Sequence, residues 1–153
     1  MVKRCFLIGH RETPERLCPL LRQAVEEHIV RYGVTEFIVG RYRNFDQLAK
    51  RAVTEAKKCH PEITLTLLLY HPAEQRRAIP PEFDGTYYPD GMERVPRRFA
   101  IVRANRYALD RSEYLIAYAA HPAGNAWEMV LYARRREKKG MIRVSNLAEQ
   151  PER

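Results

Sequence analysis

Residues 34–53 read VTEFIVGRYRNFDQLAKRAV, and this stretch contains one complete transition from a strand to a helix. The short apolar run 37–39 stops at Gly40, as expected of a strand that is buried on both faces. Apolar residues return from Phe45 at alternating intervals of three and one, which predicts an amphipathic helix. A strand that leads directly into a helix is the repeating unit of an α/β fold.

The same unit recurs on both sides of this stretch. Alternating strands and helices predict parallel strands that are joined by right-handed crossovers. We therefore expect one α/β domain over residues 1–153, a Rossmann-like three-layer sandwich of about five parallel strands with helices on both faces. Pro19 predicts that the first helix starts only at Cys18 or bends there. The expected strands are residues 5–9, 36–40, 63–70, 113–119 and 141–145, and the expected helices are 17–32, 45–56 and the segments after Pro96 and after Gly124.

Residues 71–96 fit neither pattern. Their proline and glycine content predicts an ordered but winding loop with room for one helical turn. Because long loops in compact domains are often functional, this segment is a candidate lid over a binding site.

Composition limits the classes of partner. The formal net charge of +8 favours anionic partners such as phosphorylated small molecules or nucleic acid. Three cysteines without metal-type spacing indicate reduced thiols and a cytoplasmic location. No apolar segment reaches the roughly 18 residues of a membrane span, and the residues MVKRCFLIGH lack the apolar length of a secretory signal. We therefore expect no membrane partner.

In a parallel sheet, ligands bind outside the carboxyl ends of the strands. Glycines, histidines, arginines and one acid follow the predicted strands, which makes this edge the expected binding site. His10, His71 and His121 could converge there, but no carboxylate shares a ligand spacing with them, so we predict no metal site. The expected ligand-binding residues after the strands are Gly9, His10, Arg11, Gly40, Arg41, Asn44, Asp46, His121, Gly124 and Asn125.

Two predicted helices start at this edge and offer free N–H groups to an anion. We expect Asn44 to cap the second helix, with Gln47 returning the bond in a capping box. Asp46 is suited to a ribose hydroxyl or a water, or it only improves the interaction with the helix dipole; both interpretations stay open. Gly124 and Asn125 start the other helix.

Several motifs together resemble the SLOG superfamily, named for the SMF/DprA and LOG proteins, and above all its uncharacterised YpsA-like branch. They are GHRET after the first strand, FIVG leading to FDQLA, TYYPDGMERVPRRFAIVRANRYALDRSEYLIAY, and the closing GMIRVSNL. The resemblance covers nearly the whole chain in order. It implies a Rossmann-like domain with strand order 3-2-1-4-5 that binds nucleotides or nucleotide-derived ligands.

The resemblance also assigns roles to particular positions. It places the family's conserved glycines, arginine and acid on Gly9, Arg11, Gly40 and Asp46. In the motif before the fourth strand, Asn105 fits, but Ala104 stands where the family has arginine, and Arg103 and Arg106 flank the gap. Glu128 lies near the acid that LOG phosphoribohydrolases use, which makes it the candidate catalytic residue.

Three functions are compatible with these residues. The first is a sensor or binding domain for a nucleotide or nucleotide derivative, with no other cofactor. The second is a phosphoribohydrolase that cleaves the N-glycosidic bond of a nucleoside monophosphate, although the LOG signature is incomplete here. The third is a DprA-like DNA-binding module, although the chain has no recognisable recognition helix. Whether the chain forms a homo-oligomer is left open.

Overall fold

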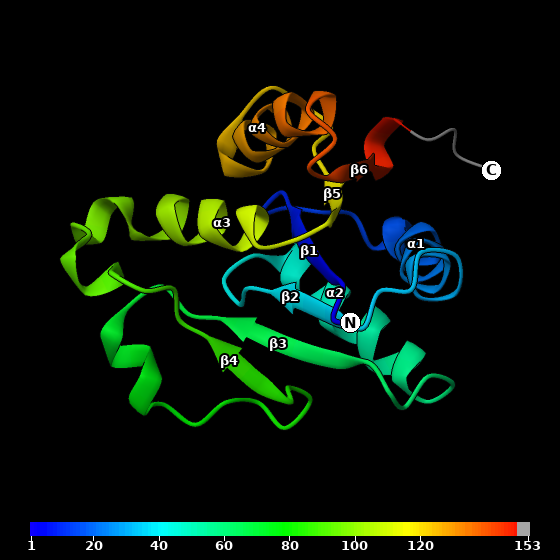
Figure 1. Cartoon of the computed structure of the whole chain (residues 1–153), viewed down its shortest axis with the longest axis horizontal. Coiled ribbons are helices and arrows are strands. Elements are labelled where there is room, and N and C mark those ends of the chain that lie inside the picture. The colour runs from blue at the N-terminus through cyan, green and yellow to red at the C-terminus, as the bar shows by residue number, and fades with distance from the viewer. Residues whose placement is uncertain (150–153) are drawn as a thin grey trace.

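The computed structural model describes residues 1–149 and has one parallel sheet with helices on both faces (Figure 1). The order of the strands is β4-β3-β2-β1-β5-β6, and every neighbouring pair is parallel. The expected α/β class is confirmed, and the five expected strands lie in the expected order. The strands are β1 (Arg4–Gly9), β2 (Glu36–Val39), β3 (Thr64–Leu68), β4 (Gly85–Tyr87), β5 (Tyr114–Tyr118) and β6 (Arg143–Asn146).

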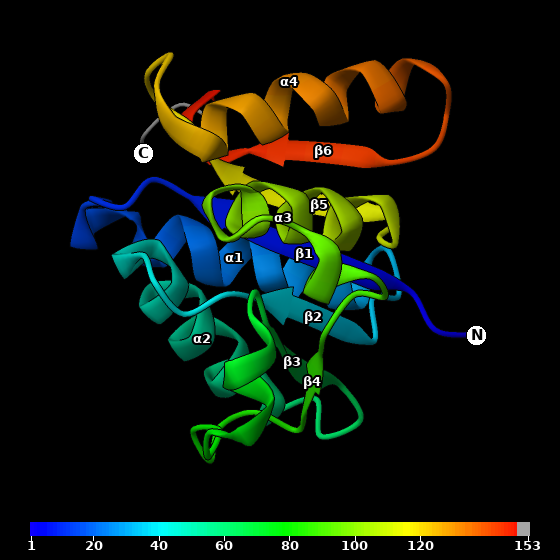
Figure 2. The same cartoon turned by 90° about the vertical axis from the view of Figure 1, so that its left-hand side faces the viewer.

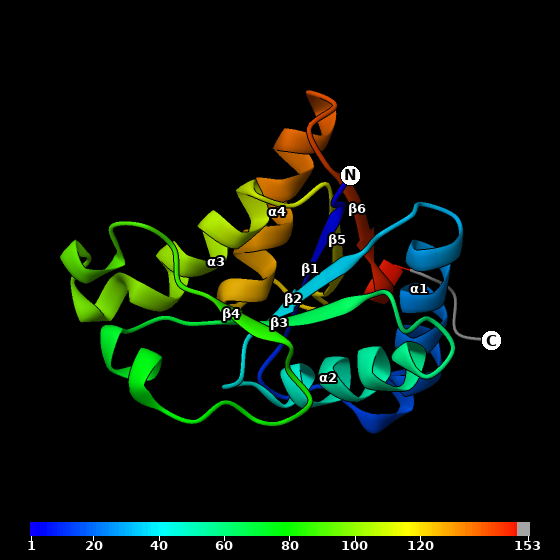
Figure 3. The ribbon, with the colours of Figure 1, turned by 60° about the horizontal axis from the view of Figure 1, so that its bottom comes forward.

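The helices form the two outer layers. Helices α1 (Cys18–Val30) and α2 (Asn44–Lys57) cover one face, and α3 (Ala100–Asp110) and α4 (Gly124–Lys138) cover the other. Figure 3 shows α2 and α3 on opposite sides of the strands, and Figure 2 shows α4 running alongside β6. None of the helices in residues 1–149 has the length and apolar character needed to cross a membrane.

The apolar run of strand β1 is unbroken because both of its faces are buried. Its side chains alternate between the two faces of the sheet, so Cys5 and Leu7 pack with α1 and α2, whereas Phe6 and Ile8 pack with α3 and α4. All four side chains are fully buried. Helix α1 begins at Cys18, one of the two expected outcomes, because Pro19 in the first turn lacks only an N–H that would have no partner inside the helix.

The segment 71–96 is more regular than expected. It contains a sixth strand, β4, which pairs with β3 in parallel, and short 3-10 turns at Pro72–Arg76 and Met92–Arg94. Phe83 and Met92 are buried, so the segment is packed onto the domain. Three residues, GTY, are too few to show a strand period, which is why the sequence did not reveal β4. Figure 3 shows β4 beside β3 at the edge of the sheet.

Gly9 allows α2 to approach the end of β1. A Cβ atom at this position would lie 2.3 Å from Cδ2 and 2.4 Å from Cγ of Phe45, in the first turn of α2. Phe45 is fully buried and cannot move away without opening the core. Gly9 is therefore required for packing, whether or not a ligand approaches it.

We expect Gly9→Ala to lower the free energy of unfolding by about 1–3 kcal/mol, the usual cost of overpacking a core. Urea denaturation followed by circular dichroism measures this. Gly85→Ala is the matched control, because a Cβ atom there would meet nothing within 4 Å, so its stability should stay close to that of the wild type. Equal stability of the two variants would contradict this role of Gly9.

Candidate functional site

The loops after β1 and β2 are joined at the start of α2. The Asn44 side chain accepts a hydrogen bond from the Thr13 N–H (2.7 Å) and donates one to the Thr13 carbonyl (2.7 Å). The Asn44 N–H also donates to the carbonyl of Arg11 (3.2 Å). The backbone that carries Arg11 is therefore held against the N-terminus of α2.

The expected capping box of Asn44 and Gln47 is wrong. Asp46 takes that role, because its Oδ2 accepts a hydrogen bond from the Arg43 N–H at 3.2 Å, while Gln47 donates to the Arg41 carbonyl. Asn44 cannot cap the helix because the oxygen and the nitrogen of its side-chain amide both form hydrogen bonds with Thr13. A local sequence motif cannot predict a contact between residues that lie 31 positions apart.

Asp46 is buried and paired. Its Oδ2 lies 3.3 Å from Nε of Arg43, and its side chain has no exposed surface. Burial raises the pKa of Asp46, and the neighbouring Arg43 opposes that shift. These contacts favour the structural interpretation of Asp46 over direct contact with a ribose hydroxyl.

A chain of hydrogen bonds continues from Arg43 across the sheet. Arg43 Nη2 donates to the Tyr70 hydroxyl (3.3 Å), which donates to Asn105 Oδ1 (3.4 Å). The Asn105 amide then donates to Asn125 Oδ1. Burial raises the pKa of Tyr70, so its hydroxyl remains a donor. This network, Arg43–Tyr70–Asn105–Asn125, connects the start of α2 on one face to α3 and the start of α4 on the other.

Gly40 makes room for this network. A Cβ atom there would lie 2.2 Å from the Tyr70 hydroxyl and 3.1 Å from Asp46 Oδ2. Side chains of the protein itself therefore fill the space beside Gly40, which the sequence had suggested for a ligand.

His10 fixes the loop after β5. Its Nε2 accepts hydrogen bonds from the backbone N–H groups of Ala120 (2.9 Å) and His121 (3.4 Å). The two imidazole rings stack with their centroids 4.0 Å apart. Burial and the neighbouring His121 lower the pKa of His10, so the neutral acceptor form is favoured. His121 itself is exposed at the edge.

Arg41 forms an ion pair with a buried acid that the sequence analysis did not identify as a candidate residue. Nε of Arg41 lies 3.7 Å from Oε2 of Glu74, which is almost completely buried. The other oxygen of Glu74 accepts hydrogen bonds from the backbone N–H groups of Tyr70 and His71, both at 2.9 Å. Glu74 thus ties the segment after β3 to the loop after β2. Nothing in the proline-rich sequence around Glu74 predicts that this acid is buried.

The remaining candidate residues are exposed. Arg11 and Arg103 reach solvent, and the guanidinium of Arg106 lies over the ring of Tyr132 at 4.7 Å. Gly124, with φ of +77°, opens α4 in a conformation that favours glycine. Glu128 is exposed on α4, and within residues 1–149 no side-chain hydrogen bond or ion pair joins it to the network.

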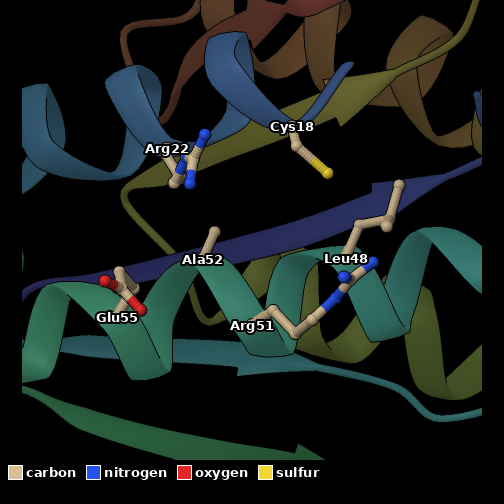
Figure 4. A pocket seen from close by; sticks show the side chains of 6 residues that line it. All are labelled: Cys18, Arg22, Leu48, Arg51, Ala52 and Glu55. Atoms are coloured by element: carbon tan, nitrogen blue, oxygen red, sulfur yellow. The ribbon is translucent and has the colours of Figure 1, made fainter. Parts of the chain in front are cut away.

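A separate pocket lies away from this edge, between α1 and α2 (Figure 4). Its volume is about 150 Å³, and its floor is apolar with charged residues at the rim. None of the expected ligand-binding residues contributes to it. The lining residues are Cys18, Arg22, Leu48, Arg51, Ala52 and Glu55. In residues 1–149 no three histidine, cysteine or acidic side chains are grouped so as to hold a metal ion.

A scan against models of known protein families finds no match to this chain, and a search of curated proteins finds none either.

Tyr70→Phe should lower the free energy of unfolding by about 1–3 kcal/mol. The substitution removes the buried hydroxyl that accepts a hydrogen bond from Arg43 and donates one to Asn105. Urea denaturation gives the value. Tyr87→Phe is the control, since the Tyr87 hydroxyl has no hydrogen-bond partner among the described residues. A loss no larger than that of the control would show that the network adds no stability.

The stability should fall as the pH drops below about 6.5, the ordinary pKa of histidine. His10 binds a proton less readily in the folded chain than in the unfolded one, so acid favours unfolding. His10→Gln keeps an acceptor for the Ala120 N–H and cannot titrate, so its stability should fall less between pH 7 and about pH 5. His28 is also buried and also has a lowered pKa, so part of the pH dependence of stability should remain in the variant. A variant with the wild-type pH profile would contradict this assignment.

Proposed function

We propose that the carboxyl edge of the sheet binds a nucleotide or a nucleotide-derived ligand, and that the protein acts as a sensor or binding domain. One observation carries the proposal: the start of α4 has no side-chain cap and no acid in its first turn. Its first N–H groups therefore remain free for an anion. Asn125, in that first turn, is held by Asn105, so this helix start is fixed in place.

Neighbouring residues supply the other contacts that a nucleotide needs. Arg11 is exposed at the adjacent strand end, where a guanidinium can bond a phosphate through two N–H groups. Tyr42 is exposed and packs against Tyr70 with ring centroids 5.6 Å apart, so it offers an aromatic surface to a base. The net charge of +8 attracts an anionic ligand. The resemblance to the SLOG superfamily supports the same ligand class.

We favour binding over cleavage of a glycosidic bond. A hydrolase needs a carboxylate that is free to act on water or on the leaving group. Asp46 and Glu74, the acids buried at this edge, are both paired with arginine. Glu128 is exposed, and within residues 1–149 its side chain forms no hydrogen bond or ion pair with the network. Ala104 also replaces the arginine of the motif that the resemblance implies.

A thermal-shift screen of nucleoside mono-, di- and triphosphates and of ADP-ribose derivatives should find a ligand that raises the unfolding temperature. For that ligand, Arg11→Ala should weaken binding about 10- to 150-fold, which corresponds to the loss of one charged hydrogen bond. Isothermal titration calorimetry measures the affinity.

Arg22→Ala is the matched control, because Arg22 is an exposed arginine on α1 at the separate pocket. Its ligand affinity should equal that of the wild type. Equal weakening in both variants would show only a general charge effect. No stabilising ligand, or release of free base from nucleoside monophosphates, would contradict the proposal.

A further inference from the structure

The start of α3 carries an unusual density of positive charge. Between residues 91 and 109 the chain has five arginines and a single acid, Glu93. Four of these arginines lie in the short segment 94–103 and all are exposed. None of the four forms an ion pair with a carboxylate of residues 1–149. They are Arg94, Arg97, Arg98 and Arg103.

Bulky apolar side chains are exposed among these arginines. Phe99, Ile101 and Val102 have exposed fractions of 48%, 38% and 43%. The opposite side of α3 packs on the sheet through Ala100 and Ala104, and none of the three exposed apolar side chains belongs to a hydrophobic core of residues 1–149. We call the seven residues the arginine tip: Arg94, Arg97, Arg98, Phe99, Ile101, Val102 and Arg103.

The arginine tip projects from the body of the protein. Figures 1 and 3 both show the start of α3 and the turn before it at the left side, beyond the sheet. A projecting end can meet a flat surface without a clash from the rest of the domain. Exposed apolar side chains next to arginines are the combination that binds the interface of an anionic lipid bilayer, where the apolar groups enter the boundary and the guanidiniums bind phosphates.

We propose that the arginine tip docks the protein onto an anionic lipid surface. The sequence led us to expect no membrane partner, but that expectation rested on the lack of a spanning segment. Surface docking needs no span. Arg103 belongs both to the tip and to the candidate residues of the carboxyl edge. The vesicle assay contains no nucleotide, so either proposal can fail without the other.

Two other occupants fit the tip less well. Single-stranded nucleic acid stacks its bases on aromatic side chains in a groove, whereas Phe99 is the one aromatic residue of the tip and Arg98 lies over its ring at 4.8 Å. Ile101 and Val102 offer nothing to stack on. A second copy of the chain, packed tip to tip, would bring the unpaired arginines of both copies together, and like charges repel.

Sedimentation with lipid vesicles tests the proposal on the full chain. The wild type should bind vesicles of mixed phosphatidylcholine and phosphatidylserine and should not bind pure phosphatidylcholine. Each arginine near an anionic bilayer strengthens binding about fivefold. The triple variant Arg97→Gln, Arg98→Gln, Arg103→Gln should therefore bind about 100-fold more weakly.

A matched control removes the same charge elsewhere. The variant Arg22→Gln, Arg31→Gln, Lys139→Gln alters three other exposed cations, and its binding should exceed that of the tip variant by at least tenfold if the location of the charge matters. Equal binding of the two triple variants, or equal binding of the wild type to both kinds of vesicle, would overturn the proposal.

The apolar side chains need their own test. Phe99→Ser with Val102→Ser keeps every charge and should weaken vesicle binding about tenfold or more. Val30→Ser with Met141→Ser, which alters two exposed apolar residues elsewhere, should not. Two further results would also overturn the proposal: tip-dependent binding of a single-stranded oligonucleotide without vesicle binding, and a dimer that the Phe99/Val102 variant dissociates while vesicle binding is unchanged.

Discussion

The hydroxyl of Tyr70 lies between Arg43 and Asn105, and the candidate site depends on this contact. The loop after β2 lies on one side of it and α3 on the other, so one buried hydroxyl connects groups from both faces of the sheet. Gly40 is part of the same constraint, because any side chain there would occupy the position of the hydroxyl. The network reaches the start of α4 through Asn125.

Two buried ion pairs at this edge restrain the loops that carry them. Arg43 with Asp46 fixes the start of α2, and Arg41 with Glu74 ties the segment after β3 to the loop after β2. A buried charge that loses its partner is costly, so each pair restrains the backbone that carries it. The two pairs restrain this edge, which would lower the ordering cost of the ligand binding that we propose.

Charge serves different purposes in different parts of the molecule. At the carboxyl edge, Arg41 and Arg43 are paired with carboxylates and hold the structure together. At the arginine tip, the arginines have no carboxylate partner among residues 1–149 and stay available to an external anion. This difference follows from position, because a buried cation must be neutralised whereas an exposed one is stabilised by water.

The sequence by itself determined the α/β class, the five strands other than β4 and the edge at which polar residues gather. These follow from apolar periodicity, which depends only on neighbours along the chain. Only the tertiary structure decided what the polar residues do. Asn44 bonds Thr13 and does not cap its helix, Asp46 is buried, and Gly9 accommodates Phe45. Each of these roles depends on a contact formed after the chain folds. Local spacing predicts elements, whereas the partner of a buried polar group is set by packing between elements that lie far apart in the sequence.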